Sequence, residues 1–239
     1  MKTSPFPLKQ KIVNGIKGFE KDGGALIFYE QFKALRAKFE YQVDMKKYKV
    51  VAVTSAIAEE GKTCTIANLA ANLASIGRKK ILLIDADLRK SDLANYLNIA
   101  TKPGITELLY GSASLEKVIN KPMDGLYFIP GGERTNGAAD LLAGDKFRSF
   151  LNRMRDQFDI ILLDTPPIIP VADTMSLKDQ IDGFIFIFRI GFTPYVMLRQ
   201  VVEEIEKEKI MGVVLNYVDP QRQKYYRRYY GKYYHKKSG

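Results

Sequence analysis

Short hydrophobic runs alternate along the chain with longer segments that have helical periodicity. Six of these runs have the length of a strand, and they occupy residues 50–55, 81–85, 126–130, 159–164, 183–188 and 212–218. They are continuously apolar, without the alternation that is typical of a sheet with one face in water. The pattern therefore indicates strands that are buried on both faces, as in a parallel sheet.

The segments between the runs predict helices. The first is expected from about Leu26, because one face of it carries four apolar residues, Phe28, Phe32, Leu35 and Phe39. Further helices are expected at residues 62–76, 138–155 and 194–209, with a break near Gly144. Strands that alternate with helices predict an α/β fold, an open and mostly parallel sheet with helices on both faces.

Composition divides the chain into three parts. Residues 1–25 mix glycine, proline and lysine and are expected to form an arm; residues 26–219 form the folded body; residues 220–239 form a basic tail. Seven of the ten net positive charges follow Asp219, which leaves +3 for the rest of the chain. The body is therefore not expected to bind nucleic acid through a strongly basic surface.

Cysteine usage and hydropathy bear on the compartment. The chain has one cysteine, Cys64, which excludes an internal disulfide. The first 24 residues have no apolar core of a signal peptide, and no apolar run reaches the length of a bilayer. We therefore expect a protein of the cytoplasm.

The stretch VAVTSAIAEEGKTCTIANLAANLA places a loop between an expected strand and an expected helix, with Gly61, Lys62 and Thr63 where the helix begins. Backbone N–H groups and the dipole at a helix N-terminus bind phosphate. We therefore expect Lys62 to bind the β- and γ-phosphates of ATP and the Thr63 hydroxyl to bind Mg²⁺. The pattern G-x-x-x-x-G-K-[ST] is incomplete, because Ala56 occupies its first glycine position.

Acidic residues stand at the ends of two other expected strands. Asp85 and Asp87 end the run that begins at residue 81, and Asp164 ends the run that begins at residue 159. The carboxyl ends of parallel strands form the edge at which open α/β sheets bind ligands. Acids at that edge, beside a phosphate loop, are typical of Mg²⁺ coordination. The sequence therefore predicts a site for ATP and Mg²⁺.

The segments GKTCTIANLAANLA, ILLIDADLRK and FDIILLDTPP together resemble the bacterial tyrosine kinases of capsular and exopolysaccharide biosynthesis, the BY-kinases. That family has a Walker A loop, a Walker A′ strand ending in D-x-D and a Walker B strand ending in Asp. The resemblance covers about residues 26–234, including the terminal tyrosines, which the related cell-division and partition ATPases lack. It implies a P-loop NTPase fold of the partition-ATPase type.

The resemblance also implies a role for each site residue. Asp85 accepts the proton of an attacking tyrosine hydroxyl, and the catalytic set is Lys62, Asp85, Asp87 and Asp164. Mg²⁺ is held by Thr63, Asp87 and Asp164. The nucleotide is bound by the loop, the start of its helix and one residue of the last strand that borders the adenine, namely Glu60, Gly61, Lys62, Thr63, Cys64 and Asn216.

Glu59 marks a departure from the family loop, which usually reads P-G-E-G-K-[ST]. Here Ala58 and Glu59 precede Glu60, so a carboxylate replaces a glycine near the phosphates. The signature lysine of the partition ATPases would fall at Ile57 and is absent, which argues against that related group.

The first helix carries Glu30, Lys33 and Arg36 at intervals of three, which places them on one face. They resemble the family's E-x-x-R-x-x-R self-association motif, with lysine in place of the first arginine, and imply a ring of subunits. A solvated charged face is the alternative. Lysine lacks the bidentate fork of arginine, so a weaker contact is expected.

The tail holds six tyrosines between arginines and lysines: Tyr225, Tyr226, Tyr229, Tyr230, Tyr233 and Tyr234. Its polarity and lack of periodicity argue against a packed element. Stacking on single-stranded nucleic acid, docking on anionic lipid and phosphorylation of the tyrosines all fit the composition. A body that binds ATP favours phosphorylation, and we expect no nucleic-acid partner.

The expected function is that of an ATP-dependent tyrosine autokinase acting on this cluster and regulating polysaccharide polymerisation or export, with trans transfer within a ring favoured by the resemblance. The alternatives are a non-kinase ATPase switch that binds a membrane or partner, and an inactive scaffold or nucleic-acid protein. The resemblance further implies a membrane-anchored co-polymerase or activator, a protein-tyrosine phosphatase, and a position at the inner face of the cell membrane through a partner or a membrane segment.

Overall fold

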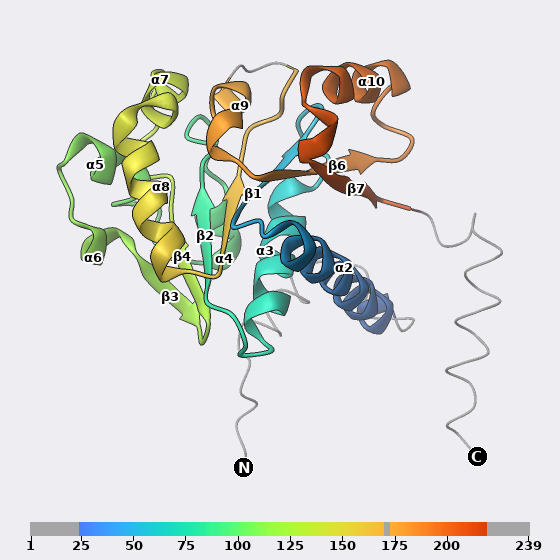
Figure 1. Cartoon of the computed structure of the whole chain (residues 1–239), viewed down its shortest axis with the longest axis horizontal. Coiled ribbons are helices and arrows are strands. Elements are labelled where there is room, and N and C mark those ends of the chain that lie inside the picture. The colour runs from blue at the N-terminus through green and yellow to red at the C-terminus, as the bar shows by residue number, and fades with distance from the viewer. Residues whose placement is uncertain (1–23, 170–172, 219–239) are drawn as a thin grey trace, which may run out of the picture.

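The computed structural model describes residues 24–169 and 173–218, which build a seven-stranded sheet with helices on both faces (Figure 1). The strand order is β3-β4-β2-β5-β1-β6-β7. The strands are β1 (Val50–Ser55), β2 (Ile81–Asp85), β3 (Asn120–Met123), β4 (Leu126–Ile129), β5 (Ile160–Asp164), β6 (Gly183–Arg189) and β7 (Ile210–Asn216). Only β3 pairs antiparallel among them, which confirms the open, mostly parallel α/β fold.

The described helices fall into two layers. They are α2 (Gly24–Lys46), α3 (Lys62–Ala74), α4 (Leu93–Leu97), α5 (Ile105–Tyr110), α6 (Leu115–Val118), α7 (Ala138–Ala143), α8 (Asp145–Gln157), α9 (Asp173–Ser176) and α10 (Tyr195–Glu204). Residues of α2, α3 and α4 share one core with the sheet, and residues of α5 to α8 and α10 share the other. Neighbouring residues of a strand enter opposite cores, as Val50 and Val51 do.

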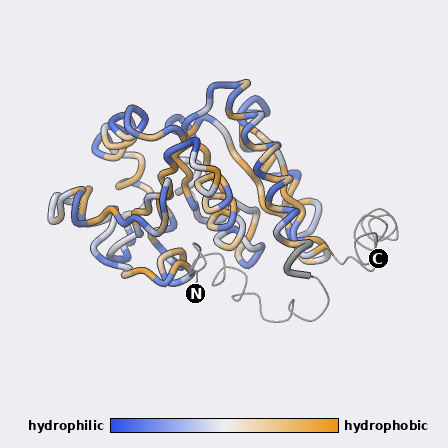
Figure 2. Tube along the Cα trace, turned by 90° about the horizontal axis from the view of Figure 1, so that it is seen from below, coloured by the Kyte–Doolittle hydropathy of each residue, from blue (hydrophilic) through white to orange (hydrophobic). Residues whose placement is uncertain are grey.

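Burial on both faces explains the continuous apolar runs. Every residue of β1, β2 and β5 is buried, including the polar residues at their carboxyl ends. Figure 2 shows the hydrophobic segments gathered in the interior, with polar segments around them. The stripe on α2 is confirmed in the same way, because Phe32 and Phe39 are buried and Phe39 packs against α3 and the sheet.

The helices agree with the expectation in one place and differ in others. The break expected near Gly144 is confirmed, since α7 ends and α8 begins there. The helix expected at 194–209 is shorter: α10 ends at Glu204, because Ile205 is extended and its buried side chain turns the chain into the core. The elements β3, α4, α5, α6 and α9, each of four to six residues, are too short to give a periodic signal.

No helix in residues 24–169 and 173–218 combines the length and the hydrophobicity needed to cross a bilayer.

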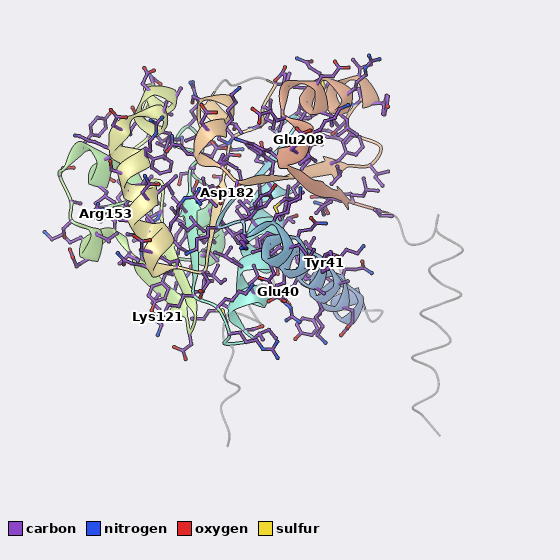
Figure 3. All side chains as sticks on the ribbon, in the orientation of Figure 1. Glu40, Tyr41, Lys121, Arg153, Asp182 and Glu208 are labelled. Carbon is purple, nitrogen blue, oxygen red and sulfur yellow. The ribbon has the colours of Figure 1, made fainter. Side chains whose placement is uncertain are left out.

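Asp182 ties three parts of the fold together just before β6 (Figure 3). Its carboxylate accepts two bonds of 2.8 Å from the Arg155 guanidinium on α8, and bonds of 2.7 and 2.8 Å from the backbone N–H groups of Lys49 and Val50. Partial burial raises the pKa of Asp182. The hydrogen bonds from Arg155, Val50 and Lys49 lower it by a larger amount, so the pKa lies below its usual value.

Asp182→Ala is therefore expected to destabilise the protein by about 3 kcal/mol, because it leaves a partly buried guanidinium and two backbone donors without their acceptor. The contribution of Asp182 is fully present above the pKa of an unfolded aspartate, about 3.9, and is lost as the pH falls through the lower folded value. Urea unfolding at pH 7 and pH 3 measures both effects. Equal losses at the two pH values would contradict this account.

Candidate active site

The phosphate loop is residues 56–61, between the end of β1 and the start of α3. Gly61 has φ +89°, a conformation that favours glycine, and a Cβ there would lie 2.1 Å from Nδ2 of Asn216. Both observations explain why glycine precedes Lys62. The free N–H groups at the start of a 13-residue helix then face the carboxyl edge of the sheet.

Glu59 adopts φ +65°, the left-handed conformation that the glycine of the family loop would adopt without strain. Its side chain is exposed. Glu59 therefore holds, with a full side chain, a conformation that favours glycine.

Glu59→Gly is expected to stabilise the protein by about 1 kcal/mol, because it relieves the strain of a non-glycine residue in this conformation. It also removes a negative charge near the phosphates, so affinity for Mg-ATP should rise. Glu59→Gln separates the two effects, since it removes the charge and keeps the strain. Calorimetric titration and thermal unfolding of the three proteins give the result; a glycine variant no more stable than the glutamine variant would contradict the strain argument.

Glu60 does not present its carboxylate to the nucleotide. The side chain is fully buried and accepts bonds from the Ile57 N–H at 3.0 Å, the Arg189 N–H at 3.1 Å and the Thr193 hydroxyl. It joins the phosphate loop to the end of β6. Only the main chain of Glu60 is left for the nucleotide-binding role expected of it.

Asp164 and Asp85 lie side by side at the carboxyl edge, because they are register partners on β5 and β2. The Thr63 hydroxyl donates to Oδ2 of Asp164 at 3.1 Å. Oδ1 of Asp164 is buried and has no hydrogen-bond partner in the part of the chain that the structure describes. Burial raises the pKa of Asp164 to about 7, against the opposing charge of Lys62, which lowers it.

The oxygen atoms of Asp164 and Thr63 are ligands of the kind that Mg²⁺ prefers. A hard cation takes carboxylate and hydroxyl oxygens, and in a phosphate site it also keeps water and phosphate oxygens, so a cluster of three acids is not required. No such cluster occurs in the described residues. Asp164 Oδ1 is a buried acceptor with no donor among the described residues, and Thr63 Oγ1 lies 3.1 Å from Oδ2 of the same carboxylate, so these two side chains would hold the ion.

Asp85 is fully buried, and its oxygens accept bonds from within the chain. Oδ2 accepts from the Ser91 hydroxyl at 2.7 Å and the Leu93 N–H at 3.2 Å, and Oδ1 accepts from the Asp87 N–H at 3.2 Å. Burial raises the pKa of Asp85 well above its usual range, and the charge of Asp164 raises it further. The remaining lone pair of Oδ1 is the one that could meet a hydroxyl.

Asp87 is only partly buried, beside the other two acids, and its charge raises the pKa of both. Its Oδ1 accepts from the Lys90 N–H at 3.1 Å. The structure thus brings Lys62, Thr63, Asp85, Asp87 and Asp164 to one edge of the sheet. Such a group can bind phosphate and a divalent cation and can position a phosphoryl group for transfer.

Cys64 and Asn216 are placed differently from the loop backbone. The Cys64 side chain is half-buried; its thiol accepts from the Tyr96 hydroxyl at 3.5 Å, and burial raises the pKa of the thiol. Asn216 lies beside the loop, where Nδ2 donates to the Glu60 carbonyl at 2.9 Å and Oδ1 accepts from the Tyr217 N–H at 3.0 Å. Each end of its amide thus has one bond to the protein, and its place beside the adenine stays a prediction.

Arg189 is a site residue that no motif in the sequence predicted. It ends β6, donates through Nη1 to the Glu59 carbonyl at 3.3 Å and lies over the rings of Phe192 and Tyr217, at 4.5 and 4.2 Å from their centroids. The only signal for it was a cation and two aromatics that follow apolar strands, in FRIGF and NYV.

The expected self-association residues are largely engaged within their own helix. Lys33 forms an ion pair with Glu30 at 2.7 Å. Arg36 pairs with Glu40 at 3.5 Å and donates to the Asn72 carbonyl on α3. Their role in a ring stays a prediction. The six tail tyrosines lie outside the described residues.

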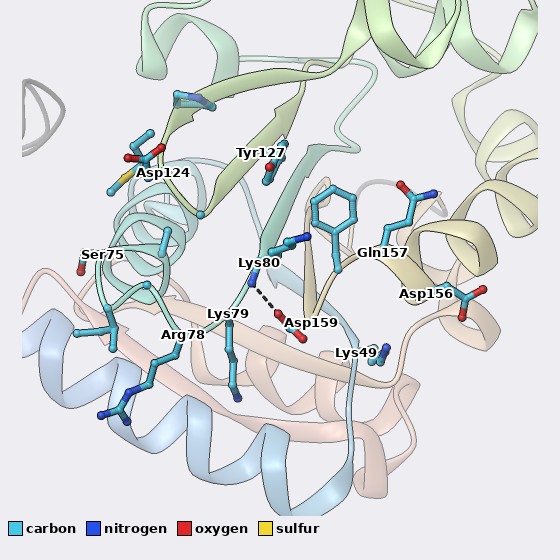
Figure 4. A pocket seen from close by; sticks show the side chains of 17 residues that line it. Lys49, Ser75, Arg78, Lys79, Lys80, Asp124, Tyr127, Asp156, Gln157 and Asp159 are labelled. Atoms are coloured by element: carbon cyan, nitrogen blue, oxygen red, sulfur yellow. Dashed lines mark hydrogen bonds between the residues drawn. The ribbon is translucent and has the colours of Figure 1, made fainter.

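A separate cavity of about 790 Å³ lies at the opposite edge of the sheet, where β1, β2, β4 and β5 begin (Figure 4). Its walls mix the cations Lys49, Arg78 and Lys80 with the acids Asp156 and Asp159. The C-terminal ends of α3 and α8 adjoin it. Helix C-termini favour cations, so these lysines and arginines are explained by the fold.

Comparison with known proteins agrees with the geometry. A family model described as "AAA domain" matches residues 48–187. The tyrosine-protein kinase CpsD of Streptococcus agalactiae serotype III is 33% identical over 196 residues, which are 80% of this chain and 82% of that protein. The kinase domain of Escherichia coli tyrosine kinase ETK superposes with a TM-score of 0.74 at 28% identity, over 79% of this chain and 74% of that chain.

Other relatives are much longer. The tyrosine-protein kinase ptk of Acinetobacter johnsonii is 32% identical over 80% of this chain, but the chain spans only 26% of that relative. Both relatives are named tyrosine-protein kinases, and the superposed domain is the kinase domain of a tyrosine kinase. The chain therefore belongs to the family of bacterial P-loop tyrosine kinases.

Proposed function

We propose that the chain is an ATP-dependent protein-tyrosine autokinase whose own C-terminal tyrosines are the substrate. The observation that carries this is the place where the last strand ends. β7 runs parallel to β6, which runs parallel to β1, so its carboxyl end lies on the phosphate-loop edge, and Asn216 donates to the Glu60 carbonyl there. The last described residues before the tyrosine-rich segment thus lie beside the loop.

The reach of the tail supports the proposal. Tyr225 is eight residues beyond Tyr217, and eight extended residues span at most about 28 Å. Tyr234 is 17 residues beyond Tyr217, which allows up to about 60 Å. The first length is enough for the chain's own site, which adjoins Tyr217, and the second allows Tyr234 to extend well beyond it.

In the proposed mechanism, Lys62 and the loop N–H groups bind the phosphates. Thr63, Asp164 and the partly exposed Asp87 would hold Mg²⁺, which would neutralise charge on the phosphates. The oxygen of the tyrosine hydroxyl attacks the γ-phosphorus and ADP leaves, while Asp85 accepts the proton of that hydroxyl. The protein's part is to position these groups and to balance charge.

The amount of ADP formed tests the proposal against a non-kinase ATPase switch. A kinase with a tethered acceptor forms ADP in a burst that ends when its acceptors are consumed, at no more than six ADP per chain for the six tyrosines. An ATPase forms ADP steadily. Replacing all six tyrosines with phenylalanine should abolish the burst, and steady ADP formation by both proteins would refute the kinase proposal.

We further propose that transfer occurs in trans within a ring. Lys62→Met with an intact tail serves as acceptor, and the six-phenylalanine chain with an intact site serves as donor. Phosphotyrosine on the Lys62→Met chain is expected if transfer is in trans. Its absence, with wild-type chains phosphorylated in parallel, would show transfer in cis.

The setting proposed for this activity is polysaccharide polymerisation or export, with a membrane-anchored co-polymerase as activator and a protein-tyrosine phosphatase that resets the tail. Among the relatives, one from Rhizobium meliloti is named a succinoglycan biosynthesis transport protein. Its name supports this setting, and we propose a place at the inner face of the membrane as part of it.

A further inference from the structure

The carbonyl groups of two successive residues of the phosphate loop are held from the same side. Arg189 donates to the carbonyl of Glu59 at 3.3 Å, and Asn216 donates to the carbonyl of Glu60 at 2.9 Å. Arg189 and Asn216 are register partners at the ends of β6 and β7, so the two donors stand next to each other.

Peptide planarity gives these two bonds a consequence for phosphate binding. In a trans peptide, the carbonyl of one residue and the N–H of the next point in opposite directions. A Glu59 carbonyl held toward β6 turns the Glu60 N–H away from β6, and a Glu60 carbonyl held toward β7 turns the Gly61 N–H the same way. Both N–H groups then point toward the inside of the loop, where a phosphate binds.

The guanidinium of Arg189 is itself fixed. It lies over the rings of Phe192 and Tyr217, and its own backbone N–H donates to the buried carboxylate of Glu60. Stacking of a planar guanidinium on aromatic rings restricts its rotation and directs its donors. Tyr217 has φ +56°, a conformation uncommon for an aromatic residue, and its ring nevertheless stays over Arg189.

We propose that Arg189 is a positioning residue for the phosphate loop, held by the ring of Tyr217, and that together with Asn216 it directs the Glu60 and Gly61 N–H groups at the β-phosphate of the nucleotide. The inference rests on the nucleotide binding of the proposed function. It adds a link between the end of β7 and the loop, because Tyr217 is the residue that directly follows this strand.

The test measures affinity for two probes, Mg-ADP and inorganic pyrophosphate, by calorimetric titration. Arg189→Met is expected to weaken both by the same factor, about tenfold, because pyrophosphate needs the loop but has no base. Arg199→Met is the matched control, since Arg199 is an exposed arginine of α10 paired with Glu203. It should leave both affinities unchanged.

A double-mutant cycle tests the part of Tyr217. Tyr217→Asn removes the ring but keeps a residue that tolerates positive φ, and Tyr217→Phe keeps the ring. Tyr217→Asn should weaken pyrophosphate binding in the wild-type background and have no further effect in the Arg189→Met background. Tyr217→Phe should behave as the wild type, and additive effects would overturn the link.

The remaining outcomes separate this inference from the proposed function. Equal affinities for wild type and Arg189→Met would overturn the positioning role and leave the kinase proposal intact. A variant that loses affinity for Mg-ADP but not for pyrophosphate would place the effect at the base, and would also overturn the positioning role. Loss of both affinities together with a markedly lower melting temperature would assign Arg189 a merely structural role. A wild-type chain that binds neither probe would refute the proposed function and this inference with it.

Discussion

Lys62→Met is expected to lower the rate of tyrosine phosphorylation between about a hundredfold and a thousandfold. The side chain stands at the first position of α3, beside Asp164, whose pKa its charge lowers. In phosphoryl transfer a lysine at this place offsets charge on the β- and γ-phosphates, and methionine keeps its length without its charge. Initial rates of phosphotyrosine formation, measured at saturating Mg-ATP, give the factor.

The matched control for this variant is Lys38→Met, on the exposed side of α2. It removes one positive charge from the surface and should keep the full rate. Thermal unfolding separates loss of chemistry from loss of fold: without nucleotide, Lys62→Met should melt within a few degrees of the wild type, while Mg-ADP should stabilise only the wild type. A Lys62→Met chain that retains more than half of the rate would contradict its assigned role.

Asp164→Asn is expected to combine a loss of activity with a gain in stability. The amide is a poor ligand for Mg²⁺, so phosphorylation should fall by about a hundredfold or more. Without Mg²⁺, the wild-type protein buries a carboxylate with one unpartnered oxygen, and burial raises its pKa to about 7. Above that pH the charged form costs stability, which a neutral amide avoids.

The stability gain should therefore depend on pH. A group whose pKa is raised by folding loses stability as the pH rises from its unfolded value toward its folded value, here from about 4 to about 7. At pH 8 and without metal, Asp164→Asn should be more stable than the wild type by on the order of 2 kcal/mol, and at pH 4 the difference should vanish. Urea unfolding in the presence of a chelator measures this. A variant less stable than the wild type at pH 8 would contradict the account of this buried acid.

The sequence predicted the edge of the sheet at which the site forms, for a physical reason. Continuous apolar runs require parallel strands buried on both faces, and parallel strands put their carboxyl ends together. Thr63 and Asp164, 101 positions apart in the chain, could thus be assigned to one site before their 3.1 Å contact was known.

Other features could not be predicted, because they depend on which strands are neighbours. The pairing of Asp85 with Asp164 follows from β2 lying next to β5, and the pairing of Arg189 with Asn216 follows from β6 lying next to β7. The burial of the Glu60 carboxylate depends on Thr193, which has no sequence signature. Local sequence patterns predict the phosphate loop and the acidic residues. The contacts that orient the loop depend on tertiary structure.

The most direct test of the central claim, that this site phosphorylates the tail tyrosines, is site-resolved mass spectrometry of the full chain after incubation with Mg-ATP. The account predicts phosphate on the cluster at residues 225–234 in the wild type and none in Lys62→Met. Phosphotyrosine in both proteins, or ADP formation by the wild type with an unmodified tail, would contradict it.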